Sequence, residues 1–276
     1  MSRNRYAAAL VCISLVGFAA TPRAAEDVTD PPREDARGAA QRGLDIAAEA
    51  DRRASGFGDS EETLTMTLRD KRGRERTRAL RVRSLERDDD GDWSLTIFDQ
   101  PVDVKGTALL TYSHGLQPDD QWIFLPALKR VKRISSKNKS GPFMGSEFAF
   151  EDLSSFELEK YRYAYLRDEA CGELHCTVSE WIPRYEHSGY SRMEVWHDTD
   201  EFRIQRIEYH DRNGKHLKTL RLDDYRLFEQ RFWRPLRMQM SNHRTGKVTE
   251  LDYDRIEFGL GLTPRDFDQN ALKSAK

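Results

Sequence analysis

The sequence predicts a mainly β, α+β fold, with one N-terminal helix and a long antiparallel sheet of about ten or eleven strands. Three observations support this prediction. Apolar and polar residues alternate in many short segments, turn residues separate those segments, and one Ala-rich segment near the N-terminus has helical spacing instead. Because a single sheet with so many strands must curl or close, we expect it to have a concave face.

Residues 1–25 are typical of a secretory signal peptide. Arg3 and Arg5 form a charged start, and Tyr6 to Ala20 is an apolar run. That run is shorter than the roughly 20 apolar residues that a membrane-spanning helix needs, so a membrane anchor is the less favoured alternative. We interpret residues 26–38, which contain Pro31 and Pro32, as a flexible mature N-terminus, and residues 39–276 as a single domain.

The helix is expected over residues 39–54, where Ala39, Leu44 and Ala47 recur at spacings that align on one helical face. The period then changes to two. In residues 62–69, Leu64 and Met66 alternate with threonines, which is typical of a half-buried strand. Further strands are expected as far as residue 125, separated by turns such as residues 88–92.

A second run of strands is expected over residues 156–258, and the tail at 263–276 is expected to hold a short helix. Asn213–Gly214 is a strong signal for a two-residue hairpin turn, which would pair His216 with Asp211. Large apolar side chains recur on one face of the strands, and they fit either a dry core or a pocket for a lipid-like ligand. They are Met66, Leu68, Leu80, Val82, Trp122, Phe124, Met193, Val195, Met238 and Met240.

Two cysteines remain once the signal peptide is removed, Cys171 and Cys176. An exported protein meets an oxidising compartment, and a four-residue loop at 172–175 would bring the two thiols within bonding distance. Zinc needs four ligands and only His175 is close, while catalytic redox pairs have CxxC spacing. We therefore expect a structural disulfide rather than free thiols.

Composition and motifs favour a non-enzymatic protein without a cofactor. The net charge of −2 falls to −5 without residues 1–25, which argues against a nucleic-acid partner. No HExxH metal motif, GxSxG nucleophile elbow or Gly-rich phosphate loop occurs. We therefore expect no metal site and no catalytic residues.

The stretch from Trp122 to Leu153 joins the two runs of strands and consists of four segments of different chemistry. Apolar residues 122–125 end at Pro126, and a basic run follows at 129–139. Next come the apolar pair Phe143–Met144 between two glycines and an acidic end at 151–152. The basic run fits either a solvated, salt-bridged loop or a surface for anionic lipid head groups or an acidic partner. We expect the turn at 141–145 to act as a gate.

This stretch resembles the outer-membrane lipoprotein-sorting-like family, the LolA-like superfamily of periplasmic carriers. The residues that carry the resemblance are Trp122, Phe124, Leu125, Pro126, Lys129, Arg130, Val131, Arg133, Ile134, Gly141, Phe143, Met144, Gly145, Ser146, Phe148, Glu151 and Asp152. The resemblance implies a strongly curved, unclosed antiparallel barrel, with helices or loops as a lid over its concave face. It also implies a periplasmic location, handling of lipids or lipoproteins, and an RND-type exporter in the inner membrane as partner.

The leading hypothesis is a periplasmic carrier that holds a lipid, a lipoprotein acyl chain or another hydrophobic ligand in an apolar cavity. Five residues are expected in the pocket: Trp122, Phe124, Phe143, Met144 and Phe148. Four cations are expected at its mouth: Lys129, Arg130, Lys132 and Arg133. The alternative is a periplasmic sensor or regulatory subunit that uses the same fold to bind a membrane protein.

Overall fold

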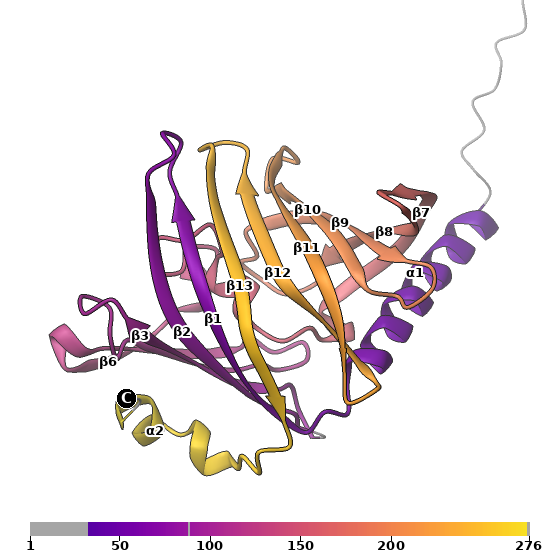
Figure 1. The fold of residues 1–276 in the computed structure, drawn as a ribbon. Helices are drawn as coiled ribbons and strands as arrows, with labels where there is room; N and C mark the ends of the chain where they lie inside the picture. The colour runs from indigo at the N-terminus through magenta and orange to yellow at the C-terminus, as the bar shows by residue number, and fades with distance from the viewer. Residues whose placement is uncertain (1–32, 88, 275–276) are drawn as a thin grey trace, which may run out of the picture. The chain divides into compact units, whose positions relative to one another are not determined.

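A computed structural model describes residues 33–87 and 89–274, and these form one antiparallel sheet of thirteen strands with a helix at each end of the chain (Figure 1). The strands are β1 Asp59–Arg69, β2 Glu75–Leu85, β3 Trp93–Gln100, β4 Ala108–Tyr112, β5 Asp120–Leu125, β6 Arg130–Arg133, β7 Tyr161–Cys171, β8 Leu174–Pro183, β9 Tyr190–Asp198, β10 Ile204–Asp211, β11 His216–Phe228, β12 Phe232–Asn242 and β13 Lys247–Phe258. The helices are α1 Arg33–Ala54 and α2 Gln269–Ser274. The expected count of about ten or eleven strands was therefore too low. β6 lies within the basic run.

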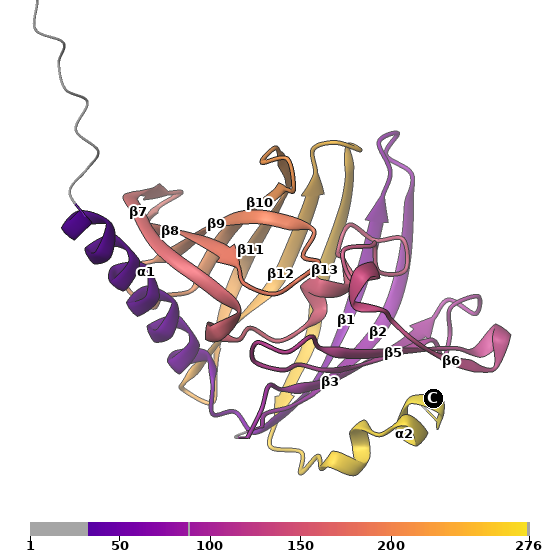
Figure 2. The same cartoon turned by 180° about the vertical axis from the view of Figure 1, so that it is seen from behind.

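The strand order is β6-β5-β4-β3-β2-β1-β13-β12-β11-β10-β9-β8-β7. Each strand except β1 and β13 pairs only with its neighbours in sequence, and the pairing of β1 with β13 joins the two runs. The sheet curves without closing, so β6 and β7 are its two edges (Figure 2). The predicted class is confirmed: mainly β, strongly curved and unclosed, with an N-terminal helix.

The segment that joins β6 to β7, residues 134–160, must run from one edge of the sheet to the other. It contains three 3₁₀ helices, η2 Ser136–Asn138, η3 Phe150–Leu153 and η4 Leu158–Lys160. We call it the crossing segment. Phe143 is only 1% exposed, and its ring lies 5.6 Å from that of Phe98 on β3. Phe143, in the turn that was expected to act as a gate, therefore belongs to the core and fills the concave side of the sheet.

The main core lies between the concave face and the crossing segment. Of the ten apolar residues expected on one face, eight belong to this core, either buried or packed against it. Trp122 and Phe124 are the exceptions. They pack in a second cluster on the opposite face of β3–β5, where the 3₁₀ helix η5 Pro264–Phe267 and α2 cover the sheet with Phe267 and Leu272.

Helix α1 begins at Arg33 instead of residue 39, and it ends at Ala54 as expected. Gly56 follows with a φ of 89°, in the left-handed region that glycine adopts readily. The predicted signal peptide at 1–25 and residues 26–32 of the predicted flexible N-terminus lie outside the described residues. Within the described part of the chain, neither helix has the length and apolar character that crossing a bilayer requires.

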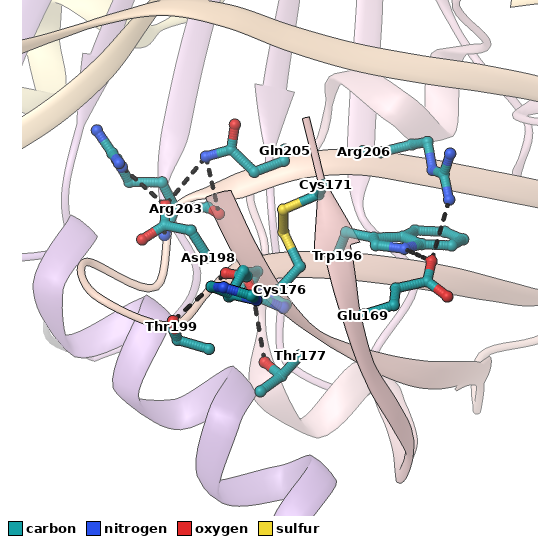
Figure 3. The surroundings of a disulfide bond; sticks show 12 residues. Glu169, Cys171, Cys176, Thr177, Trp196, Asp198, Thr199, Arg203, Gln205 and Arg206 are labelled. Atoms are coloured by element: carbon teal, nitrogen blue, oxygen red, sulfur yellow. Dashed lines mark hydrogen bonds and ion pairs between the residues drawn. A yellow bond between two sulfur atoms is a disulfide. The ribbon is translucent and has the colours of Figure 1, made fainter. Parts of the chain in front are cut away.

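The predicted disulfide between Cys171 and Cys176 is confirmed, although its loop differs from the expectation (Figure 3). The β7–β8 turn comprises only Gly172 and Glu173, since Cys171 pairs with Leu174. The cysteines are therefore diagonal neighbours with Cα atoms 5.8 Å apart. Cys176 is fully buried and packs with Trp196 in a small cluster on this side of the sheet.

The second predicted turn also differs. Residues 212–215 connect β10 to β11, and the backbone N–H of Asp211 donates to the carbonyl of Lys215. His216 consequently pairs with His210 and not with Asp211. The two-residue prediction was wrong, and the longer turn brings these histidines together on one face.

Replacing both cysteines with serine is expected to lower the free energy of unfolding by about 2 kcal/mol, because the crosslink closes a loop of only a few residues. Denaturant unfolding with and without reductant measures this difference. Reductant should destabilise the wild type by a similar amount and leave the double variant unchanged. A double variant as stable as the oxidised wild type would contradict the prediction.

Candidate functional site

A cavity of about 480 Å³ lies between α1, the crossing segment and the concave face of β8–β12. Its wall is mainly apolar and aromatic. The large apolar residues that line it are Phe148, Phe156, Trp181, Met193, Phe202, Ile204, Ile207, Leu220, Leu222, Trp233 and Met238. A volume of this size is within the roughly 300–1,000 Å³ of small-molecule sites.

The helical wall stays hollow because α1 presents small side chains to it. Ala47, Ala50 and Ala54 line the cavity, so this wall has methyl groups where a longer side chain would fill the space. The helix also lies very close to β7. A Cβ on Gly43 would be 2.7 Å from the backbone carbon of Ala164, so any residue other than glycine would clash with β7 at this position.

Polar contacts attach α1 near its middle and at its C-terminal end. Near its middle, Arg42 forms an ion pair of 3.0 Å with Asp168, and its guanidinium lies 3.5 Å from the ring centre of Tyr165. Near its end, Arg53 forms an ion pair of 2.9 Å with Glu201. Because these contacts bridge α1 to β7 and to the β9–β10 turn, they fix the helix across the hollow part of the sheet.

One end of the cavity holds two buried lysines and one aspartate. Lys160 Nζ lies 2.8 Å from Asp119 Oδ1, and Lys139 Nζ lies 3.7 Å from Asp119 Oδ2. Burial alone would raise the pKa of the Asp119 carboxyl, but the two lysines hold it below its usual range. Burial lowers the pKa of Lys139. Two ammonium groups thus share one carboxylate beside an apolar wall.

Glu151 and Asp152 of the crossing segment also face the cavity. The Glu151 carboxylate accepts hydrogen bonds from the Gly189 backbone N–H at 2.9 Å and the Ser188 hydroxyl at 2.9 Å. Burial, together with the charge of Asp152, raises the pKa of Glu151. These contacts join the crossing segment to the β8–β9 loop.

Asp152 makes the most buried ion pair of the molecule's described part, with Lys218 on β11. Their side chains are each only 4% exposed, and the Nζ to Oδ2 distance is 2.5 Å. The Tyr190 hydroxyl donates to the other carboxylate oxygen at 2.7 Å, and the Ala149 N–H donates at 2.6 Å. The carboxylate is therefore fully hydrogen-bonded where it anchors the crossing segment to the sheet.

The cavity combines a long apolar wall with a compact charged end, an arrangement that suits an amphiphile. Apolar chains gain from burial along the wall, whereas an ionised or hydrogen-bonding group can replace water at the lysines. Among the described residues, no group of three or more His, Cys, Asp or Glu side chains is arranged to hold a metal ion.

Of the predicted pocket residues, Phe148 lines the cavity. Phe143 lies in the adjacent core, and Met144 packs against that core while its carbonyl accepts a hydrogen bond of 2.7 Å from Arg78. Trp122 and Phe124 lie on the other side of the sheet. Their alternation with Ile123, which is in the main core, gives two apolar faces on β5. The sequence does not tell which of these faces is concave.

The four predicted mouth cations do not reach the cavity. Lys129 follows the 3₁₀ helix η1 Pro126–Leu128, Arg130 begins the edge strand β6, and Lys132 is exposed on that strand. Arg133 is also exposed and forms an ion pair with Asp120. Charged side chains on a short edge strand prevent pairing with other chains, which accounts for much of the basic run. Lys139, at the end of that run, does line the cavity.

Met193 and Met238, which were expected on one face as core or pocket residues, line the cavity. Sequence reasoning missed most of the remaining wall, namely the contributions of α1, β10 and β11. Ile204 and Ile207 lie on β10, where a register shift between Ile204 and Arg206 interrupts the alternation, and Leu220 lies on β11. No local signal separates such residues from core residues, because the cavity forms where the crossing segment stops filling the concave face.

His197 on β9 is a buried polar residue next to this wall. It is 0% exposed, and neither ring nitrogen has a hydrogen-bond partner among the described residues. Its ring centre lies 5.8 Å from that of Trp181, which lines the cavity. Burial lowers its pKa from 6.5 to about 4, so the ring is neutral at pH 7.

Comparison with known proteins identifies a matching family model and solved structures of similar fold. Residues 90–274 match a family model described as an uncharacterized protein. The chain is 51% identical to a domain from Vibrio parahaemolyticus described as an outer membrane lipoprotein-sorting protein, with a TM-score of 0.83. The match covers 85% of this chain and 99% of that one. No curated protein matches the chain.

Two further solved structures share the fold. A DUF1329 family protein from Desulfovibrio piger is 28% identical, with a TM-score of 0.81, and the match covers 85% of this chain and 99% of that one. A LolA superfamily protein from Nitrosomonas europaea is 21% identical, with a TM-score of 0.68 and coverage of 84% and 99%. At that identity, the likeness concerns the fold alone.

Lys218→Met is expected to lower the free energy of unfolding by about 3–5 kcal/mol, because the Asp152 carboxylate would remain buried without its cation. Adding Asp152→Asn should restore part of the loss, and a double-mutant cycle by denaturant unfolding measures the coupling. The exposed pair of Arg237 and Asp252 provides a control, and Arg237→Met should leave the free energy of unfolding almost unchanged. Strictly additive costs at 152 and 218 would contradict a coupled pair.

His197 is expected to make stability depend on pH. The unfolded chain takes up a proton at this residue below about pH 6.5, whereas the folded protein does so only near pH 4. The contribution of His197 to the free energy of unfolding is therefore fully present above pH 6.5, and it falls by about 3 kcal/mol as the pH drops to 4. The difference in unfolding free energy between wild type and His197→Leu should change by this amount over that range.

If His197→Leu keeps the wild-type pH dependence of stability, the assignment to His197 is wrong.

Proposed function

The chain belongs to the outer-membrane lipoprotein-sorting-like family, and on that basis we propose that it is a periplasmic carrier for a lipid, a lipoprotein acyl chain or another hydrophobic ligand. A carrier binds and releases without chemical turnover, so it needs no catalytic residues or cofactor. The function resides in the cavity and in the segments that enclose it.

The observation that carries this proposal is the apolar cavity of about 480 Å³ on the concave face. Burial of apolar surface contributes about 25 cal/mol per Å² and would drive uptake of an acyl chain. Trp181 and Trp233 lie in the wall, and Ala50 on α1 faces them across the space. A void of this size is larger than the gaps that packed cores tolerate, which favours a ligand.

The charged end of the cavity supports an amphiphilic ligand. A polar group would lie near Lys139 and Lys160, where it could share their charges with Asp119. The chain would extend along Phe156 and Met193. Of the residues predicted from the sequence, Phe148 remains in this proposed binding site.

We assign the carrier to the periplasm and propose an RND-type exporter in the inner membrane as the partner that delivers or receives the ligand. The disulfide between Cys171 and Cys176 supports an oxidising compartment. The predicted signal peptide at 1–25 would direct the export.

The proposal is tested with protein purified from its native compartment. Mass spectrometry should detect a co-purifying lipid, and the emptied protein should bind a fluorescent fatty acid. Ala50→Phe should weaken that binding about tenfold or more, because the ring would occupy the cavity.

Ala40→Phe, on an exposed part of the same helix, is the matched control and should bind like the wild type. Absence of both lipid and fatty-acid binding would refute the carrier function. A stoichiometric membrane protein recovered without lipid would instead indicate the sensor or regulatory subunit.

A further inference from the structure

Three hairpin turns lie side by side at one end of the sheet, at the top of Figure 1. Together with the strand residues that flank them, they span residues 70–76 at the β1–β2 connection, 211–216 at the β10–β11 connection and 242–247 at the β12–β13 connection. Register places them together, because Arg69 pairs with Val248, and Lys218 pairs with Asn242. We call these residues the basic end of the sheet.

Direct contacts confirm that the turns form a continuous row. A Cβ on Gly246 would lie 3.5 Å from the Cβ of Lys71, so the β1–β2 and β12–β13 turns touch. The ring centres of His216 and His243 are 4.3 Å apart, and both rings contact the hydroxyl of Thr219. The row therefore runs across the full width of the strands from β2 to β10.

The basic end concentrates positive charge on a protein whose net charge is −2. It holds three acids, Asp70, Glu75 and Asp211. Its eight cations are Lys71, Arg72, Arg74, Arg76, Arg212, Lys215, Arg244 and Lys247. The local net charge is therefore +5, opposite in sign to that of the whole chain.

Most of this charge is not neutralised within the molecule. Among the residues that the structure describes, Arg74 is the one cation of the eight with an ion pair, to Asp70 at 2.6 Å. Arg212 donates to the backbone carbonyls of His187 and Ser188. The other six side chains are exposed and make no ion pair with a described residue. Stability of the fold does not explain why they gather here.

The chemistry of the basic end favours a plane of anionic charge over a protein partner. The three turns contain no aliphatic or large aromatic residue, and apart from the histidines they consist of charged residues, Asn, Thr and Gly. Protein interfaces depend on buried apolar and aromatic anchors, which are absent from these turns. A row of protruding, fully solvated cations matches the head groups of an anionic bilayer.

We propose that the basic end docks the protein on an anionic lipid surface. The inference rests on the proposed carrier function for its purpose, because docking there would bring the ligand pathway to the membrane. Arg212 holds the β8–β9 loop, whose His187 lines the cavity. The crossing segment is equally close, since Asn242 donates to the Glu147 carboxylate at 2.6 Å.

Sedimentation of the mature protein with vesicles tests the proposal. One set contains anionic phosphatidylglycerol with phosphatidylcholine, and the other contains phosphatidylcholine alone. The protein should bind the anionic vesicles, bind phosphatidylcholine much more weakly, and dissociate as salt concentration rises. Each Lys or Arg near an anionic surface strengthens association about fivefold. The variant Lys71→Glu/Lys215→Glu/Arg244→Glu, with one change per turn, should therefore bind at least about 100-fold more weakly.

A matched control reverses the same number of charges elsewhere. Lys129, Arg130 and Lys132 are exposed on the β5–β6 hairpin and form no ion pair with a described residue. Lys129→Glu/Arg130→Glu/Lys132→Glu gives the same net charge and should retain most of the binding. Equal loss in both triple variants would overturn the assignment to the basic end, as would equal binding to both kinds of vesicle.

Two more measurements complete the test. In the first, polyglutamate and free anionic vesicles compete with the bound vesicles for the protein. If polyglutamate displaces the protein at a lower concentration of negative charge than the free vesicles do, an acidic protein partner is indicated and the proposal is overturned. Fatty-acid binding without vesicles should be unchanged in the basic-end variant, since its turns lie outside the cavity wall. Vesicle docking without fatty-acid binding would support the docking surface and refute the carrier function. Fatty-acid binding without vesicle docking would support the carrier function and refute the docking surface.

Discussion

The buried ion pair between Asp152 and Lys218 is the interaction on which the arrangement of the concave face depends. The chain must pass from one edge of the unclosed sheet to the other, and the crossing segment has little regular structure to fix its path. Asp152 supplies a fixed point because its carboxylate is satisfied by Lys218, by Tyr190 and by a backbone N–H. A buried pair of this kind gives positional specificity more than net stability, because desolvation offsets much of the attraction.

The crossing segment divides the concave face into a filled part and a hollow part. Phe143 packs against Phe98 of β3 and fills the concave side there. Phe148, Phe156 and Lys160 line the hollow part, where β8–β12 and α1 enclose the cavity. Since Ala50 and its neighbours on α1 are small, the helix covers this space without filling it. The cavity therefore exists because neither α1 nor the crossing segment fills this part of the concave face with large side chains.

Charge is distributed in three separate places that serve different purposes. The lysines at 139 and 160 are buried at the cavity with Asp119, where they can interact with a ligand. The cations of β6 lie on an exposed edge strand, where they oppose pairing with other chains. Those of the basic end protrude from three turns and remain available to an anionic surface. The basic run at 129–139 contains cations of the first two kinds, Lys139 at the cavity and those of β6 at the edge, so it is not one functional patch.

Local chemistry determined much of this protein from the sequence. Alternation around Leu64 and Met66, the helical spacing before residue 54 and the spacing of Cys171 and Cys176 act between near neighbours, so they could be interpreted correctly. Only the tertiary structure decided that Ile123 packs on the concave side of the sheet, whereas Trp122 packs on the other side under the C-terminal tail. The sequence could not separate them, because both faces of β5 are apolar. The cavity wall was equally hidden, since its residues come from strands far apart in sequence and look like any core residue. Their exposure to a cavity depends on what the crossing segment leaves uncovered.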